Sequence, residues 1–325
     1  MKRMLRNDFS WSKSRHEKFV ECQRAYLFHY YQSWGGWDKA APARTRELYI
    51  LKKLSNRYTW AGNIVHSNIR DALHSIRRGE SQDAGAIIGL ARDTMRRDFV
   101  ASKKRAYWTQ NIRKDFSGLI EHEYEEPVSD DVWRENWANV EQALSWFFRS
   151  DWPRQAQAWS PEQVLEIDEM DFDRSFCTID GVKVFAAPDL AFRGDDGCVH
   201  IIDWKTGRSR EGYDEQVVLY ALYLEQRYSL PIDRMQATLV YLNHGEQKTV
   251  SIDKASIDTT LARFQSSVAS MRNVLADVSG NVPASEERFV AAQNALACAR
   301  CPFRRPCGMA LAAGETRATG CDTSS

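Results

Sequence analysis

Two aspartates and a lysine in the middle of the chain have the residue types and spacing of a hydrolytic metal site. Asp189 lies on one predicted strand, and Asp203 stands two residues before Lys205 on the next. Carboxylate oxygens are the ligands that Mg²⁺ and Mn²⁺ prefer. A lysine beside a bound metal can orient an attacking water and help remove its proton. Such a group could hydrolyse a phosphodiester, which needs an in-line water and cations that neutralise the growing charge.

The elements predicted around the two aspartates allow them to converge. The run Gly-Asp-Asp-Gly at 194–197 predicts a tight hairpin that joins a strand at 182–192 to a strand at 199–204. Asp189 and Asp203 therefore lie on neighbouring strands. The sequence predicts that their carboxylates meet.

A helix predicted at 213–228 carries two further candidates. Asp203 and Lys205 share one face of their strand, because strand side chains repeat every two residues. The helix follows this strand directly and should pack across its end. Gln216 and Tyr220 are one turn apart on one helix face, where they could hold the lysine or a phosphate. Tyr220 also belongs to an apolar stripe of the helix, so core packing alone would explain it.

His66 and a group of acids complete the candidates for metal binding. His66 lies near the start of a helix predicted at 60–78; histidines in such places are more often structural, but its position upstream of two acids favours a metal ligand. Glu166 is a weaker candidate on its own strand. Its acidic neighbours are interleaved with apolar residues and are expected to be solvated: Asp168, Glu169, Asp171 and Asp173.

Three cysteines near the C-terminus, Cys298, Cys301 and Cys307, are close enough in sequence to be metal ligands. A metal that needs four thiolates must recruit one more, and Cys22 is the best choice because its helix would need anchoring. Spacing alone leaves zinc and iron–sulfur open. The remaining cysteines are assigned to sheet packing or to a frayed tail: Cys177, Cys198 and Cys321.

Composition limits the class of protein. The chain has 325 residues, enough for one large or two ordinary domains, and its 44 basic and 44 acidic residues balance. No apolar run approaches the roughly 20 residues of a membrane-spanning helix, and no signal peptide is predicted. We therefore expect a soluble protein of the cytoplasm with no membrane partner, in which cysteines bind metal or pack rather than form disulfides.

Periodicity predicts the other elements. A helix at 12–31 with Ser12 as its N-cap opens the chain, and residues 67–158 are mainly helical with a break at Glu126-Pro127. The remaining predicted elements are strands at 164–170, 175–178, 237–242 and 248–252 and a helix at 254–276.

The order of these motifs resembles that of the PD-(D/E)XK nuclease superfamily, specifically its RecB-like exonuclease branch. The matching pieces are His66, Pro188-Asp189, Asp203-Trp204-Lys205 and Gln216 with Tyr220. The resemblance implies that Asp189, Asp203 and His66 bind the metal and that Lys205 is the catalytic lysine. Gln216 and Tyr220 would then be the branch-specific motif. The first acid stands in Ala186-Ala187-Pro188-Asp189 rather than the Gly-x-x-Asp common in the family, which is a small departure.

The cysteines resemble a narrower group. One upstream cysteine and a C-terminal Cys-x2-Cys-x5-Cys resemble the arrangement in AddB-type and CRISPR-associated RecB-like nucleases. That resemblance implies a [4Fe–4S] cluster held by Cys22, Cys298, Cys301 and Cys307, which staples the two chain ends together. It favours iron–sulfur over structural Zn²⁺ with the same ligands.

These observations predict an α/β fold: a restriction-endonuclease-like core with a small mixed sheet flanked by helices, a helical insertion, and an iron–sulfur lobe formed by both termini. The predicted divisions are an N-terminal helix at 1–59, an insertion carrying His66 at 60–158, a nuclease core at 159–280 and a cysteine cluster at 281–325.

The predicted function is Mg²⁺- or Mn²⁺-dependent cleavage of DNA, as an exonuclease on ends or single strands, with a helicase or another protein as a possible partner. Two alternatives stay open: an endonuclease with a defined target, and a nuclease-fold subunit that only binds DNA or scaffolds a repair, CRISPR-adaptation or defence complex. Basic residues beside aromatic ones suit DNA contacts, although a solvated helical face with core aromatics explains each cluster better when it is taken alone. These clusters are Arg77-Arg78, Arg96-Arg97, Lys103-Lys104-Arg105 with Tyr107-Trp108, and Arg300 with Arg304-Arg305.

Overall fold

The computed structural model describes residues 6–111, 113, 115–168, 175–209 and 212–308. The chain divides into two compact units. Unit 1 comprises 1–56, 98–126 and 267–325, and unit 2 comprises 57–97 and 127–266. Within the described ranges, no helix has the length and apolar character that crossing a bilayer demands.

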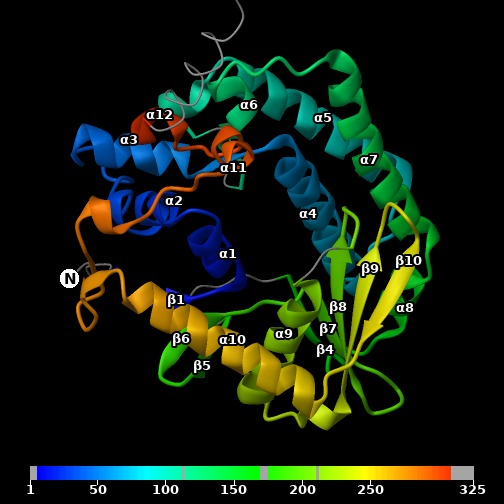
Figure 1. The fold of residues 1–325 in the computed structure, drawn as a ribbon. Coiled ribbons are helices and arrows are strands. Elements are labelled where there is room, and N and C mark those ends of the chain that lie inside the picture. The colour runs from blue at the N-terminus through cyan, green and yellow to red at the C-terminus, as the bar shows by residue number, and fades with distance from the viewer. Residues whose placement is uncertain (1–5, 112, 114, 169–174, 210–211, 309–325) are drawn as a thin grey trace, which may run out of the picture. The chain divides into compact units, whose positions relative to one another are not determined.

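Unit 2 is built on a five-stranded mixed sheet in the order β10-β9-β8-β7-β4 (Figure 1). The strands β8 and β9 run parallel, and the other neighbouring pairs are antiparallel. The bounds of the strands are β4 Val164–Ile167, β7 Leu190–Arg193, β8 Val199–Lys205, β9 Met235–Tyr241 and β10 Glu246–Val250. The small mixed sheet predicted from the sequence is therefore present.

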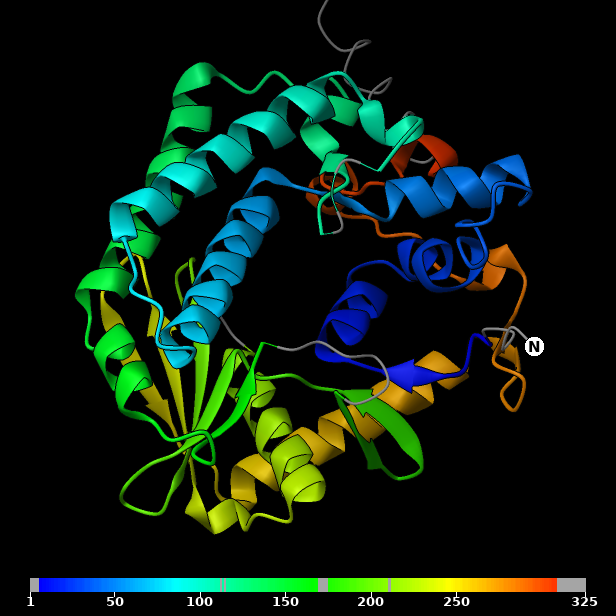
Figure 2. The same ribbon diagram turned by 180° about the vertical axis from the view of Figure 1, so that it is seen from behind.

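Helices cover both faces of this sheet (Figures 1 and 2). On one face, Trp204 of β8 packs edge-on against Phe147 and Trp152, with ring centroids 5.7 and 5.2 Å apart. Asp203 and Lys205 point to the opposite face, because neighbouring strand residues alternate. That face meets α9 (Tyr213–Tyr228), whose bounds agree with the predicted helix. Two further helices of the unit pack against α4 (Arg57–Arg77): α7 Asp130–Arg149 and α8 Trp152–Ala158.

The prediction of a single strand at 182–192 is wrong, because this segment forms two strands that pair with different neighbours. β6 (Val182–Phe185) forms a hairpin with β5 (Phe176–Ile179), and residues 186–189 lie outside any strand before β7 begins. Pro188 has no backbone N–H to give to a ladder, which explains the interruption. The β5–β6 hairpin turns at Asp180-Gly181, where both residues have positive φ, as the common two-residue hairpin turn requires.

Unit 1 opens with a helix that is interrupted at Cys22. Ser12 caps α1 (Lys13–Glu21) as predicted, its hydroxyl accepting from the Arg15 N–H. The predicted helix to residue 31 is wrong in its continuity, because Cys22 is extended (φ −162°) and becomes the N-cap of α2 (Gln23–Leu27). A π-helix, η1 (Phe28–Gln32), follows. The break turns the Cys22 sulfur toward backbone N–H groups instead of along a helix face.

The remaining elements complete the two units. The predicted helix at 254–276 ends earlier, at Arg272, because residues 275–277 pair with β12 as an antiparallel strand. The other bounds are β1 Ser10–Trp11, α3 Ala43–Leu51, β2 Leu54–Ser55, α5 Ala84–Lys103, η2 Ala106–Trp108, β3 Gly118–Leu119, α6 Ile120–Glu123, η3 Ile232–Arg234, α10 Lys254–Arg272, β11 Leu275–Asp277, β12 Val282–Pro283, η4 Glu286–Arg288, α11 Ala295–Ala299 and α12 Arg304–Cys307.

Two histidines of unit 1 predict that its stability depends on pH. Burial, followed by the charges of Lys18, Lys52 and Arg15, lowers the pKa of His29 well below 6.5. Burial, followed by Lys103, lowers the pKa of His122 to about 4. Below pH about 6.5 these imidazoles become protonated in the unfolded chain but stay neutral in the folded chain. Their contribution to stability is therefore full above that pH and is lost as pH falls towards 4.

Urea unfolding at pH 7.5 and pH 5 measures this effect. We expect the urea midpoint of the unaltered protein to be lower at pH 5 than at pH 7.5. The midpoint of His122→Asn should fall less. This variant keeps a polar partner for the Ser102 hydroxyl, which lies 2.9 Å from the imidazole Nδ1. An equal fall in both proteins would show that His122 is not responsible.

Candidate active site

The two aspartates of the predicted site do converge. Leu190 pairs with Ile202 across the antiparallel strands β7 and β8, which brings Asp189 beside Asp203. The Trp204 N–H donates to Asp189 Oδ2 at 2.7 Å and fixes that carboxylate. Both aspartates are buried; the exposed fraction of Asp203 is 2 %. Asp189 precedes β7 rather than ending a strand. It converges with Asp203 because the adjacent residues, Leu190 and Ile202, are paired at the start of β7.

His66 joins this pair from α4. Its Nδ1 lies 3.2 Å from Asp189 Oδ1. Burial alone would lower the pKa of the imidazole, but the charge and hydrogen bond of Asp189, with Asp203 and Asp168 behind it, raise the pKa to about 9. The predicted neighbourhood of His66 and the two acids is thus present, and its net negative charge attracts a cation.

Asp168 is a site residue that the sequence reasoning missed. It was expected to be solvated, but its carboxylate lies with His66 and Asp189, and one ligand atom from each residue falls within 4.8 Å of the others. The Asp168 N–H donates to the Asp189 carbonyl at 2.9 Å, which extends the β4–β7 ladder and holds the two acids side by side. Burial, then the charge of Asp189, raises the pKa of Asp168 to about 6. Its one sequence signal was its place at the end of a predicted strand.

Lys205 lies in a chain of polar contacts on the same face. It forms an ion pair with Asp203 Oδ2, and its Nζ donates to Gln216 Oε1 at 3.0 Å. The Nζ also lies 4.0 Å from the ring centroid of Tyr213. Burial, then Asp189, raises the pKa of Asp203 to about 6, while Lys205 opposes that rise. Gln216 thus contacts the lysine, as one of its predicted roles requires.

Tyr220 serves both the core and the site. Its ring is buried in unit 2, yet its hydroxyl donates to Asp203 Oδ1 at 3.4 Å and lies 2.5 Å from Gln216 Nε2. Burial, then Asp203, raises the pKa of Tyr220 well above 10, so the hydroxyl stays protonated and can donate. Core packing and a polar role are therefore not alternatives for Tyr220, since the residue has both.

Glu166 lies outside this group. Its Oε1 accepts from the Tyr223 and Tyr228 hydroxyls at 2.7 and 2.6 Å, and Arg227 lies 3.4 Å away. These contacts fasten β4 to α9. Three of its acidic neighbours lie outside the described residues: Glu169, Asp171 and Asp173.

Comparison with known families decides the identity of this site. The model of the PD-(D/E)XK nuclease superfamily matches residues 10–308. The chain belongs to the PD-(D/E)XK nuclease superfamily. A search of curated proteins finds no match to this chain. Membership indicates nuclease activity and a nucleic-acid substrate, and it places both the acidic site of unit 2 and the cysteines of unit 1 within the matched region.

The four cysteines proposed as ligands in this PD-(D/E)XK chain all belong to unit 1. The Cys22 sulfur accepts from the Ala25 and Ala292 N–H groups at 3.4 and 3.3 Å, and the Cys301 sulfur accepts from the Phe303 N–H at 3.4 Å. Burial, then the Cys22 and Cys307 charges, raises the pKa of the Cys298 thiol. The upstream cysteine and the C-terminal ones are therefore near enough to interact.

The other cysteines have different surroundings. Cys177 is buried in β5, which confirms its packing role, and burial raises the pKa of its thiol to about 11. Cys198 is only half-buried and precedes β8 in the hairpin turn, so it is not a sheet-packing residue as predicted. Cys321 lies outside the described residues.

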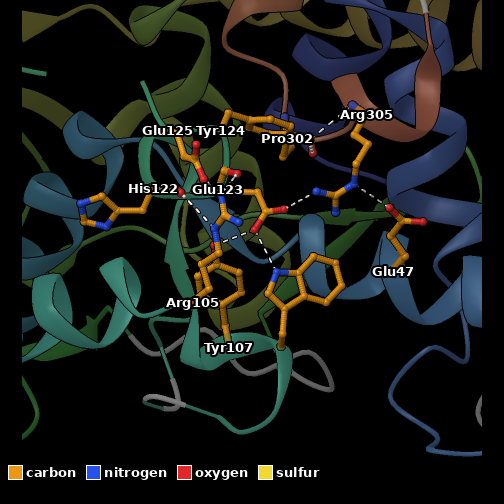
Figure 3. Close-up of polar contacts among 10 residues, drawn as sticks. Glu47, Arg105, Tyr107, His122, Glu123, Tyr124, Glu125, Pro302 and Arg305 are labelled. Atoms are coloured by element: carbon orange, nitrogen blue, oxygen red, sulfur yellow. Dashed lines mark hydrogen bonds and ion pairs between the residues drawn. The ribbon is translucent and has the colours of Figure 1, made fainter. Parts of the chain in front are cut away.

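Buried polar contacts anchor the cysteine-bearing segment within unit 1 (Figure 3). Arg305 lies 2.5 Å from Glu123 Oε1 and 3.1 Å from Glu47 Oε1. The Tyr124 hydroxyl donates to the Pro302 carbonyl at 2.6 Å. Glu123 also accepts from the Tyr107 hydroxyl and the Trp108 indole at 2.7 and 2.9 Å. Tyr107, Trp108 and Arg305, which the sequence offered for DNA contacts, have internal contacts that hold the segment between Cys301 and Cys307.

Proposed function

We propose that the chain is a divalent-metal-dependent deoxyribonuclease that acts as an exonuclease on DNA ends or single strands. The single observation that carries the proposal is the unbroken set of contacts within unit 2. On one side His66, Asp168 and Asp189 form a compact ligand group. On the other, Asp203, Lys205, Gln216 and Tyr220 touch one another in order.

The ligand group fits a hard divalent cation. One imidazole nitrogen and two carboxylates, with ligand atoms within 4.8 Å of one another, suit Mg²⁺ or Mn²⁺, which favour oxygen ligands. We assign His66, Asp168 and Asp189 to this ion, and Asp203, whose charge helps to raise the pKa of His66, would be a further ligand. A bound ion would supply Lewis-acid stabilisation of the phosphate and a lower pKa for an attacking water.

The residues of the chain then position the reaction. Lys205 is held between Asp203 and Gln216, so its ammonium group can orient a water and neutralise charge on a phosphate oxygen. Tyr220 keeps Gln216 in place through its hydroxyl. A module that only binds DNA does not need this buried lysine–aspartate pair, whose desolvation is costly. This argument favours an enzyme over the scaffolding alternative.

We propose in addition that Cys22, Cys298, Cys301 and Cys307 bind a [4Fe–4S] cluster that joins the two chain ends into one lobe. Backbone N–H groups directed at the Cys22 and Cys301 sulfurs suit thiolate ligands. The cysteine spacing, which resembles that of iron–sulfur nucleases, favours this cluster over structural Zn²⁺ with the same ligands. Absorbance near ~400 nm of anaerobically purified protein supports iron–sulfur, and stoichiometric zinc in a colourless protein contradicts it.

A cleavage assay with end-labelled DNA tests the proposed enzyme. We expect degradation in Mg²⁺ or Mn²⁺, none in a chelator, and a loss of about 10²- to 10⁴-fold in Lys205→Ala with DNA binding retained, since the lysine acts on the chemical step. Exposed Lys248→Ala, whose partner is Asp214, is the matched control. Undiminished cleavage by Lys205→Ala in Mn²⁺ contradicts the assignment of the lysine. DNA binding without cleavage by the unaltered chain supports the scaffolding alternative.

A further inference from the structure

Two tryptophans of unit 1 are exposed although tryptophan is usually buried. The exposed fractions are 37 % for Trp34 and 43 % for Trp37. Their rings form an edge-to-face pair with centroids 5.1 Å apart, and Trp37 continues edge-on to Tyr49 at 6.0 Å. The three rings form a continuous aromatic surface outside the acidic site.

The backbone that carries these rings is tightly built. Consecutive turn hydrogen bonds run from Trp34 to Tyr31, from Gly36 to Ser33 and from Asp38 to Gly35. A Cβ on Gly36 would come within 3.0 Å of Tyr49 Cβ and of the Thr45 carbonyl. The turn therefore lies directly on α3, and the tryptophans are held in position before any ligand arrives.

Positive charge gathers beside the rings. The segment 33–53 carries five basic and two acidic residues in a chain of zero net charge. Lys53 Nζ lies 4.3 Å and Lys52 Nζ 5.3 Å from the Tyr49 ring centroid. One of the two acids, Glu47, is paired with Arg305, and one of the five basic residues, Arg44, is paired with Glu286. Burial, then repulsion by Lys53, lowers the pKa of Lys52 to about 8. An anion would relieve this repulsion.

We propose that the Trp34–Lys53 patch, made of Trp34, Trp37, Tyr49, Lys52 and Lys53, binds single-stranded nucleic acid. Bases would stack on the tryptophans, and the lysines would contact the phosphates. A duplex hides the faces of its bases, so the patch suits a single strand. Tryptophan and tyrosine are also enriched in protein interfaces, but lysine is depleted there, so the two lysines favour a nucleic acid over a protein partner.

This inference rests on the proposed nuclease function for the choice of nucleic acid. The test measures binding alone: anisotropy of a labelled oligothymidylate with full-length Lys205→Ala protein in a chelator. Adding Trp34→Ala and Trp37→Ala should weaken binding by at least about 5-fold, because each stacked base contributes appreciably. Trp→Phe at both positions should restore much of the affinity. Lys52→Ala with Lys53→Ala should reduce the salt slope by about 1.4.

Trp137→Ala is the matched control, because Trp137 lies under a basic residue, Arg92, whose charge Glu141 neutralises. We expect no change in affinity for this variant. Circular dichroism checks that each variant is folded. Unchanged affinity for the oligonucleotide in the alanine variants overturns the proposal. This holds even if sedimentation of these variants shows that a contact between protein molecules has changed. Loss of cleavage and loss of binding are separate readouts, so failure of the nuclease assignment would leave this binding result interpretable.

Discussion

Asp189→Asn is expected to remove DNA cleavage and divalent-metal binding together while the fold of unit 2 persists. The asparagine keeps an oxygen for the Trp204 N–H, which Asp189 accepts at 2.7 Å, and its amide can donate to His66. It loses the charge that draws a cation to His66 and Asp168. Metal catalysis supplies several kcal/mol, so a loss of at least about 10³-fold in cleavage rate follows.

Calorimetric titration with Mn²⁺ and a cleavage time course measure the two effects. Asp214→Asn is the control, since Asp214 is an exposed acid on α9 that pairs with Lys248. It should leave both the heat of Mn²⁺ binding and the rate unchanged. Mn²⁺ binding of unaltered strength in Asp189→Asn would remove Asp189 from the ligand group.

Much of the site could be predicted because its geometry follows from local rules. The alternation of side chains puts Asp203 and Lys205 on one face of β8. The one-turn spacing puts Gln216 and Tyr220 on one face of α9. A tight hairpin between the two strands needs only the Gly-Asp-Asp-Gly turn at 194–197. Each of these relations spans a few residues, and the structure contains each of them.

The missed features depend on pairings between distant segments. Asp168 enters the site because its N–H continues a ladder with Asp189, which is far along the chain. Apart from its place at the end of a predicted strand, no local pattern distinguished it from the acids around it. Cys22 breaks its helix where its sulfur accepts from the N–H of Ala292, at the other end of the chain. Tertiary contacts overrode a helical pattern whose own preference was weak.

Glu123→Ala is the second large expected effect, and it concerns the stability of unit 1. The Glu123 side chain is 1 % exposed and accepts from Arg305, Tyr107 and Trp108 (Figure 3). Without it, a guanidinium and two donors lose their buried partner. Leaving the Tyr107 hydroxyl and the Trp108 indole without their acceptor costs about 1–3 kcal/mol each, a large part of the stability of an ordinary domain, whereas Arg305 is 46 % exposed and its charge can be solvated. Urea unfolding should show a strongly lowered midpoint, because Arg305 loses the buried partner that fixes its segment.

Comparison with Glu47, the second partner of Arg305, distinguishes the effect of burial on stability from the effect of charge. Glu47 contacts the same guanidinium at 3.1 Å, but its side chain is 31 % exposed. A solvated pair contributes only about 0–1 kcal/mol, so Glu47→Ala should barely move the midpoint. Equal losses in the Glu47 and Glu123 variants would mean that the charge of Arg305, rather than the desolvated carboxylate, determines stability. A loss confined to Glu123→Ala would instead identify Glu123 as the buried group that fastens the cysteine segment to the rest of its unit.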